Sequence, residues 1–427
     1  MKVKYIYSAC IEIDVNGFRI LTDPWFTDGA YDGSWFLFPK VDPFKHLTKP
    51  DLIYISHIHP DHYDPEFLKA LIQKWGPIPI LIPDLQSNYL LRKGMSDGLE
   101  LTPTRYFQND LIEIHIEEND TGSKSDIDSA LLVIQKDTGS ALLNLNDCIY
   151  HEAHTQKLRD IIRAKNLDLD LLALGYTGAG PFPQCYYDIP DDRENALKSA
   201  EEKKQSFFDR YRRYAEAFSS KWHLPFAGEY LLGGQLTYLN PFRGVADAVE
   251  VTEFDDKAVV FHPGGEIDLQ SGEIVGARKE KYSDQEVVRR CDAIESSEMD
   301  YEVDVHVPFA RINFQRYVRA AVLKATAKSE VSDPYLLIFT IMFKGKPTER
   351  YTVELLSGVV NTIPLSEVEF PDQHEELFID YRYFFGLLIG LYHWNNAEVG
   401  SHFMRKRFPA DNFRRDVYPF LNFMSVC

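Results

Sequence analysis

Residues 51–71, "DLIYISHIHPDHYDPEFLKAL", combine a strand pattern, a histidine cluster and a helix pattern. The run "DLIYI" is short and apolar, which predicts a buried strand that ends at Ser56. From Asp64 onward, apolar residues recur at helical spacing, with Asp64 as a plausible N-cap and Pro65 at the first helical position. The segment therefore predicts a strand, a short loop and a helix.

The loop contains His57, His59, Asp61 and His62, in a chain that has 13 histidines in all. The spacing HxHxDH offers His57 and His59 to one metal ion, and Asp61 and His62 to a second. A polar loop without metal is the alternative. Four ligand-type side chains grouped between a buried strand and a helix favour the metal site.

The motif "SHIHPDH" after "DLIYI" resembles the signature of the metallo-β-lactamase superfamily, and "ILTDPWF" resembles a strand and turn of its lactonase and phospholipase-like branch. The order of the further segments is similar to the metallo-β-lactamase-like part of CMP-N-acetylneuraminate hydroxylase and its bacterial relatives, from about residue 20 to the end. These segments are "LTDPWFTDGAYDGSWFLFP", "LLNLNDC", "YTGAGPFP", "PFAGEY", "HPGGEIDL" and "HWNNAEVGSHFMRKRFPADN".

The resemblance implies an α/β fold, the αββα metallo-β-lactamase sandwich, in which two sheets pack together and helices cover the outside. The alternation of hairpins, strands and helices along the chain favours the same architecture. We expect a catalytic domain over residues 1–300, with a helical insertion at about 191–222. Residues 301–427 are expected to form a C-terminal α+β unit that contributes to the substrate pocket.

The resemblance also implies a ligand set: His57, His59, Asp61 and His62 match the first motif, and Asp147 matches the aspartate that bridges two ions. Turn capping is the alternative role for Asp147. Asp61 and Asp147 are the expected catalytic residues. Where the superfamily usually has a third-motif histidine, this chain reads "GSKSDIDSALL", so Asp126 or Asp128 is the expected replacement ligand.

A carboxylate in place of an imidazole suits iron or manganese better than zinc. Certain superfamily members are non-haem di-iron hydroxylases with a carboxylate at this position. The resemblance therefore implies a di-iron monooxygenase, an oxidoreductase that hydroxylates a small polar metabolite with dioxygen as co-substrate. The alternative is a metallo-hydrolase that acts on an ester, lactone or phosphodiester, with zinc as a further candidate metal. A non-catalytic binding module is a third hypothesis.

Five candidate substrate-binding residues lie outside the ligand motifs, and each has a structural alternative. Trp25 could wall the pocket or pack in the core. The Gly178 amide could face the site, or the glycine could serve a turn. Glu229 stands near the place of the usual last histidine, for which His223 or His262 could substitute, although each is expected to be structural. His393 and Asn396 could contact substrate or cap the C-terminal unit.

Charge and cysteine usage limit the expected partners. The net charge of −19 disfavours a nucleic-acid partner. The sequence contains no run of 18 apolar residues, so no segment is expected to span a membrane. The five cysteines are scattered without a CxxC or CxH pair, which argues against a Rieske-type centre in this chain. Electrons for an oxygenase would come from an external electron-transfer protein. Unpaired cysteines and the absence of an export signal predict a cytoplasmic protein.

Overall fold

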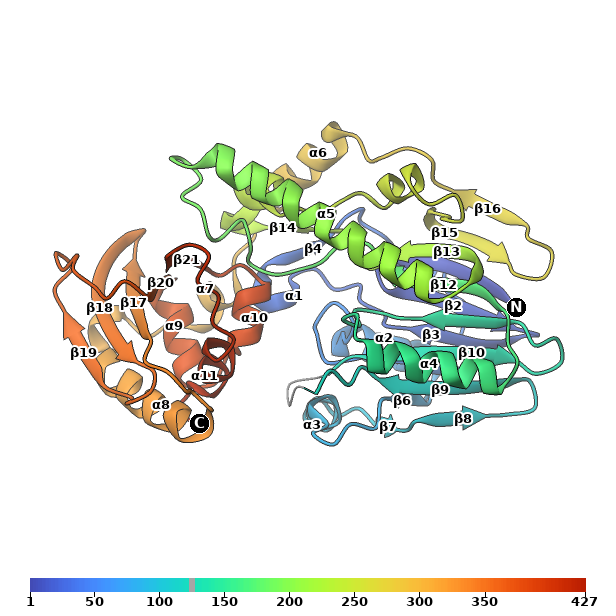
Figure 1. The fold of residues 1–427 in the computed structure, drawn as a ribbon, viewed down its shortest axis with the longest axis horizontal. Coiled ribbons are helices and arrows are strands. Elements are labelled where there is room, and N and C mark those ends of the chain that lie inside the picture. The colour runs from blue at the N-terminus through green and yellow to red at the C-terminus, as the bar shows by residue number, and fades with distance from the viewer. Residues whose placement is uncertain (123–126) are drawn as a thin grey trace.

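The structure, a computed structural model, describes residues 1–122 and 127–427. Two large sheets face each other in its N-terminal part (Figure 1). Within the described residues, the first sheet has eight strands in the order β16 (Ile274–Ala277), β15 (Phe261–Asp268), β1 (Lys2–Tyr7), β2 (Cys10–Val15), β3 (Phe18–Thr22), β5 (Leu52–Tyr54), β6 (Ile80–Ile82) and β7 (Thr102–Pro103).

The second sheet has six strands in the described part of the chain. Their order is β13 (Ser220–Phe226), β12 (Leu169–Gly175), β11 (Ala141–Asn144), β10 (Ser129–Gln135), β9 (Ile112–Glu118) and β8 (Tyr106–Gln108). In β10, Leu131 and Val133 join the apolar layer between the sheets, whereas Leu132 and Ile134 join the layer on the outer face. This alternation is the period of two that a strand buried on both faces requires.

Helices cover the outer faces of both sheets, which completes the αββα sandwich expected from the sequence (Figure 1). Leu158 of α4 (Glu152–Ala164) and Tyr211 of α5 (Arg193–Ala217) pack on the six-stranded sheet. Phe67 of α2 (Pro65–Trp75) and Leu90 of α3 (Tyr89–Asp97) pack on the other sheet. The predicted insertion at about 191–222 is one 25-residue helix, α5, followed by strand β13.

Local sequence signals explain two of the elements that position the histidine cluster. Helix α2 begins after Asp64, whose side chain accepts a hydrogen bond from the Phe67 amide at 2.9 Å, as the N-cap pattern predicts. The hairpin between β2 and β3 turns at Asn16 and Gly17, both with positive φ, which is the conformation that an Asn-Gly pair favours in a hairpin turn.

The C-terminal part forms a separate sheet with strand order β19 (Val360–Ile363), β18 (Lys346–Glu354), β17 (Leu336–Phe343), β20 (His374–Asp380) and β21 (Phe403–Phe408). Its helices are α8 (Phe314–Lys328), α9 (Tyr381–Leu388), α10 (Trp394–Val399) and α11 (Val417–Phe423). The unit sits at one end of the sandwich, with α10 next to α1 (Ala30–Gly33) (Figure 1). The remaining elements are the paired strands β4 (Trp35–Leu37) and β14 (Tyr230–Leu232), helices α6 (Asp284–Ile294) and α7 (Asp300–Asp304), and 3₁₀ turns at Pro43–Lys45, Gly234–Phe242, Ala248–Glu253 and Phe309–Arg311.

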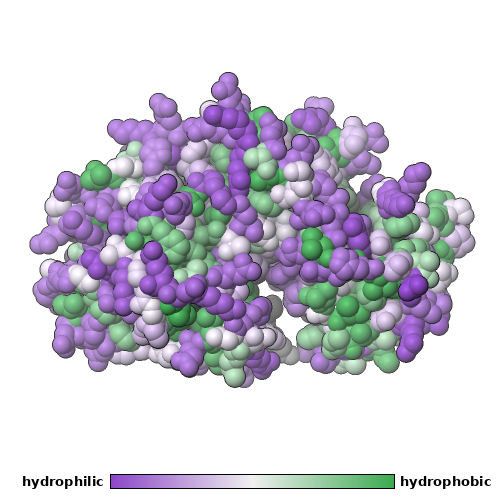
Figure 2. Space-filling model, turned by 180° about the vertical axis from the view of Figure 1, so that it is seen from behind, coloured by the Kyte–Doolittle hydropathy of each residue, from purple (hydrophilic) through white to green (hydrophobic). Residues whose placement is uncertain are grey.

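The face shown in Figure 2 is mostly hydrophilic, with hydrophobic residues in scattered groups. The space-filling view is hollowed at its lower edge, between the C-terminal unit and the sandwich (Figure 2). Among the described residues, no helix is both long and apolar enough to cross a lipid bilayer.

Candidate metal centre

The histidine cluster lies at one edge of the sandwich, where strands of both sheets begin or end. Strands β3 and β5 pair in parallel, so Asp23 and His57, which follow them, emerge on the same side. Asp147 follows β11, and Asp128 precedes the antiparallel strand β10, so both reach the same edge from the second sheet. Ser129 joins the sheets there, because its hydroxyl donates to the Ser56 carbonyl at 2.9 Å.

A first group of donor atoms surrounds the Nε2 atom of His57. The Nδ1 atom of His59 lies 2.8 Å from it, and Oδ1 of Asp128 lies 3.4 Å from it. His57 is fully buried, and both burial and the neighbouring histidines lower its pKa. Its imidazole is therefore neutral, which is the form that binds a metal.

A second group surrounds the Nε2 atom of His62. Oδ2 of Asp147 lies at 3.5 Å and Oδ2 of Asp61 at 3.6 Å. Asp147 is close to both groups. Its carboxylate oxygen, a ring nitrogen of His57 and a ring nitrogen of His62 all lie within 4.8 Å of one another, so Asp147 lies between the two groups. The Asp147 side chain is 40% exposed, which leaves this side of the centre open.

Hydrogen bonds on the far side of the rings orient both buried imidazoles. The Ser56 hydroxyl lies 2.9 Å from Nδ1 of His57 and 3.3 Å from Nδ1 of His62. Asp23 accepts from the Ser56 amide at 2.7 Å, and its second oxygen lies 3.5 Å from Nδ1 of His62. With Nδ1 of each ring occupied in this way, Nε2 of His57 and His62 is left to face the donor groups, the arrangement that metal-ligating histidines use.

The residues present fit metal ions on three grounds. With metal–ligand bonds of about 2.1 Å, neighbouring ligand atoms lie about 3.0–3.4 Å apart, close to the donor spacings found here. Nε2 of His62 is buried and has no hydrogen-bond partner in residues 1–122 and 127–427. Burial lowers the pKa of His62, but Asp61 and Asp147 more than offset this and raise it well above its usual value. A cation is therefore favoured between these carboxylates, and a metal ion can replace the proton.

The C-terminal unit reaches this centre through α10. Oδ1 of Asn395 accepts a hydrogen bond from Nε2 of His59 at 3.0 Å, which leaves Nδ1 of His59 facing His57. His393 caps α10, accepting from the Asn395 amide, and Asn396 donates to Asp32 at 3.4 Å. The sequence pointed to this segment, but the contact to a metal-ligand candidate is made by Asn395 rather than by His393 or Asn396.

Tyr31 connects the C-terminal unit to Asp61. Its hydroxyl donates to Oδ1 of Asp61, and its carbonyl accepts from Nε2 of His402 at 2.7 Å. Tyr31 and Asp32 both have left-handed backbone conformations, with φ of 56° and 59°, which are uncommon outside glycine. Tyr383 donates to the Asp32 carboxylate at 2.7 Å, so the C-terminal unit stabilises this strained pair on both residues.

Replacing Asn395 by alanine should weaken metal binding about 10- to 100-fold, because the bond that orients His59 is lost. Asn396→Ala is the matched control on the same helix, since Asn396 bonds to Asp32 and to no ligand candidate among the described residues. Its metal affinity should stay within about twofold of the wild type. Titration of metal-free protein with Co²⁺, followed by visible absorption, measures both. Equal affinities for the two variants would show that Asn395 does not orient His59.

The other candidate substrate residues make structural contacts. Trp25 is 2% exposed and packs on Tyr7 and Trp35, which favours its core-packing alternative. A Cβ on Gly178 would lie 1.9 Å from the Phe207 ring, so close packing requires this glycine. Glu229 pairs with Arg278 at 2.5 Å in a separate buried cluster.

His223 and the two third-motif aspartates are the other candidate ligands that the sequence predicts. Nδ1 of His223 lies 2.7 Å from the carboxylate of Asp255. This contact is structural, because within the described part of the chain His223 bonds to no member of the histidine cluster. Of the two third-motif aspartates, Asp128 lies beside His57, whereas Asp126 falls in the stretch 123–126, outside the described residues. Ser56, Tyr31 and Asn395 were not singled out as functional. Only Ser56 carried a local signal, because it directly precedes His57 at the strand end.

Comparison with known proteins supports the class of fold that this geometry defines. Residues 2–179 match the family model described as the beta-lactamase superfamily domain. The chain thus contains a β-lactamase superfamily domain, and the resemblance inferred from "SHIHPDH" is confirmed.

Two relatives and one solved structure illustrate the similarity. A Mycobacterium tuberculosis protein whose name describes it as a Rieske 2Fe-2S iron–sulfur protein is 31% identical over 251 residues, 56% of this chain and 46% of that protein. The cytidine monophosphate-N-acetylneuraminic acid hydroxylase of Danio rerio is 31% identical over 150 residues, 34% of this chain and 25% of the enzyme. An isothiocyanate hydrolase from Delia radicum gut bacteria aligns with a TM-score of 0.43 at 13% identity, over 63% of this chain and 99% of that one. The matched region spans less than half the length of either relative.

Proposed function

We propose that this chain is a non-haem di-iron oxygenase of the hydroxylase type that acts on a small polar metabolite. The observation that carries the proposal is Asp128, whose carboxylate lies 3.4 Å from Nε2 of His57, where the superfamily usually supplies a histidine. An oxygen donor there makes the ligand set more suitable for iron or manganese than for zinc. The similarity to a hydroxylase supports the same reaction class.

In this proposal, His57, His59 and Asp128 hold one ion, and His62 and Asp61 hold the other. Asp147 lies between the groups and bridges them. When bound, the ions supply the one-electron and dioxygen chemistry that protein side chains lack. The surrounding residues fix the ligands: Ser56 and Asp23 orient the buried imidazoles, Asn395 orients His59, and Tyr31 holds Asp61.

Hydroxylation by dioxygen also needs reducing equivalents. Among the described residues, the cysteines are all free, and none forms a paired ligand set for an iron–sulfur cluster. We therefore propose an external electron-transfer protein as a partner. The relative named for a Rieske centre supports iron–sulfur chemistry as the class of donor.

The alternative function is a metallo-hydrolase, favoured by the three histidines of the cluster, all of which lie at the site. In that case the same residues would hold ions that supply a Lewis acid for the hydrolysis of an ester, lactone or phosphodiester. Asp61, which faces His62, would steer the nucleophile.

Oxygen uptake distinguishes the two functions. Metal-free protein is loaded anaerobically with Fe²⁺ or Zn²⁺ and then exposed to dissolved oxygen. We expect the iron form alone to consume oxygen, about one molecule per two irons, and to gain a visible absorption band. Ester or phosphodiester turnover by the zinc form, with no oxygen consumption by the iron form, would show that the protein is a hydrolase.

A further inference from the structure

Helix α5, the insertion of the sandwich, brings the side chain of Arg210 to the strand ends beside Asn146, the residue that precedes Asp147. Tyr211 and Tyr214 of α5 are buried against the six-stranded sheet, and this packing fixes the position of the helix on the sheet. Arg210 lies between these anchored residues and the loop after β12.

The guanidinium is placed by its contacts with the strand ends. Nη2 of Arg210 lies 3.6 Å from the position that a Cβ on Gly175 would occupy, and the Asn146 carbonyl lies 3.6 Å from the same position. Gly175 ends β12, and Asn146 immediately precedes Asp147. Burial lowers the pKa of Arg210, and among the neighbouring groups Asp147 opposes this lowering most strongly.

Arg210 is poorly satisfied by the protein. A guanidinium has five N–H donors. Among the residues that the structure describes, Arg210 makes one long hydrogen bond, from Nη2 to the Thr177 carbonyl at 3.5 Å. Within residues 1–122 and 127–427, no carboxylate lies within ion-pairing distance of it. By contrast, Arg212, two residues along, pairs with Asp209 at 2.7 Å.

Packing holds the guanidinium in place without using its donors. The Phe207 ring stacks under it at 4.4 Å, and Gly178 leaves the space that this ring fills. A stacked arginine is pre-organised, so little side-chain entropy is lost when its planar edge binds an anion.

Charge at the centre favours an anion once metal is present. Two divalent ions balance the charge of the four carboxylates Asp23, Asp61, Asp128 and Asp147, and Arg210 adds a further positive charge. Bound cations dominate the local potential in this way. The site therefore attracts anions even though the chain has a net charge of −19.

We propose that Arg210 binds an anionic group of the substrate, a carboxylate or a phosphate, next to the metal centre. Either group accepts two parallel hydrogen bonds from the edge of a guanidinium. The inference rests on the proposed function for its metal ions, and it restricts the substrate class from any small polar metabolite to an anionic one.

The test compares Arg210→Gln, Arg210→Lys and the matched control Arg212→Gln, each with and without metal. Isothermal titration measures the binding of inorganic phosphate and, separately, of succinate, and metal content is measured for every sample. We expect Arg210→Gln to bind at least one probe about 10-fold or more weakly than wild type. Arg210→Lys should recover part of the loss, and Arg212→Gln should bind as wild type does. The more affected probe identifies phosphate or carboxylate as the favoured group.

Two results would overturn the inference. Equal affinity of wild type and Arg210→Gln for both probes would show that the guanidinium binds neither. Loss of metal from Arg210→Gln would show that Arg210 serves only to balance the charge of Asp147 and Asp128. If wild type binds no metal but its anion binding still depends on Arg210, the proposed function fails while the anion site stands.

Discussion

Replacing Asp147 by asparagine is expected to lower the metal affinity of the centre at least about 100-fold, or about 2.7 kcal/mol. The carboxylate lies 3.5 Å from Nε2 of His62 and between the two donor groups, so its charge acts on both ions. Asparagine keeps the size of the side chain but loses the anionic oxygen. The protein should retain at most one ion per chain and lose its activity, which metal analysis and oxygen uptake measure together.

The fold should survive this substitution, because the Asp147 side chain is 40% exposed and lies in a loop after β11. Asp168→Asn is the control for the substitution, since Asp168 is exposed and lies in the loop before β12. Two ions retained by Asp147→Asn at wild-type affinity would contradict the bridging role.

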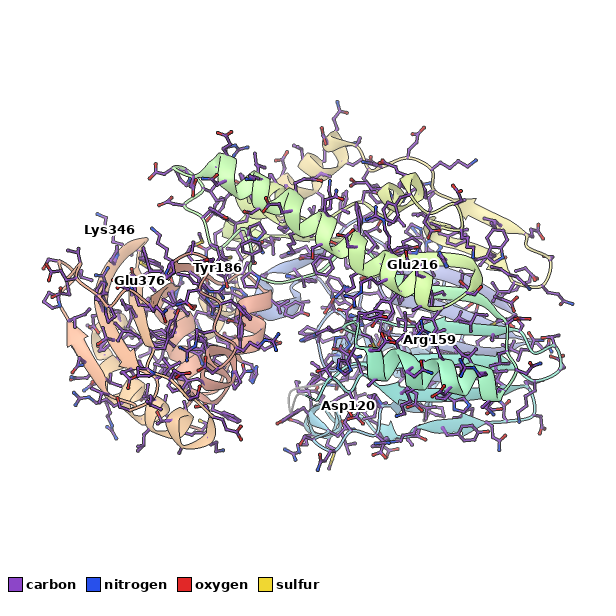
Figure 3. The ribbon with its side chains drawn as sticks, in the orientation of Figure 1. Asp120, Arg159, Tyr186, Glu216, Lys346 and Glu376 are labelled. Carbon is purple, nitrogen blue, oxygen red and sulfur yellow. The ribbon has the colours of Figure 1, made fainter. Side chains whose placement is uncertain are left out.

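Replacing Arg405 by methionine is expected to lower the free energy of unfolding by about 3–5 kcal/mol. Arg405 is completely buried in β21, ion-pairs with Glu375 at 2.6 Å and donates to Glu398 at 2.5 Å. Methionine preserves much of the volume but leaves two buried carboxylates without a counter-charge. Nη1 of Arg405 also donates to the Tyr186 hydroxyl, which lies where the C-terminal unit meets the rest of the chain (Figure 3). Urea unfolding measures the loss.

The effect of Arg405→Met should depend on pH. Burial raises the pKa of Glu398, and Arg405 opposes that rise. Without the arginine the pKa rises further, so the variant should be less destabilised at pH 5, where Glu398 binds a proton, than at pH 8. Lys406→Met, at an exposed neighbouring position, should change stability by no more than about 0.5 kcal/mol. A loss equal to that of the control, at either pH, would mean that the buried network is not stabilising.

Local patterns were sufficient to predict the sandwich and the core of the candidate site. The strand before His57, the cap of α2 at Asp64 and the hairpin at Asn16 depend on neighbours along the chain, and the structure has each of them. The grouping of His57 with His62 was visible in one short motif. Its approach to Asp147 followed from the resemblance, because spacing alone does not relate residues 57 and 147.

The remaining parts of the site depend on contacts that no local pattern records. Asn395 reaches His59 across 336 positions, and His402 reaches Tyr31 across 371. A polar run such as "HWNNAEVGSHF" indicates that one of its side chains reaches the site. Which side chain does so depends on which face of the helix is turned toward the site. The contact of Glu229 is of the same kind, since its partner Arg278 is 49 residues away and holds it in another cluster.

Anomalous diffraction from crystals grown with Fe²⁺ tests the central claim most directly. The account predicts two peaks at the iron edge, about 3.5–4 Å apart. One would lie among His57, His59 and Asp128, the other between His62 and Asp61, with Asp147 contacting both. Crystals saturated with metal that show no peak among these side chains, or a single ion with Asp147 directed to solvent, would contradict it.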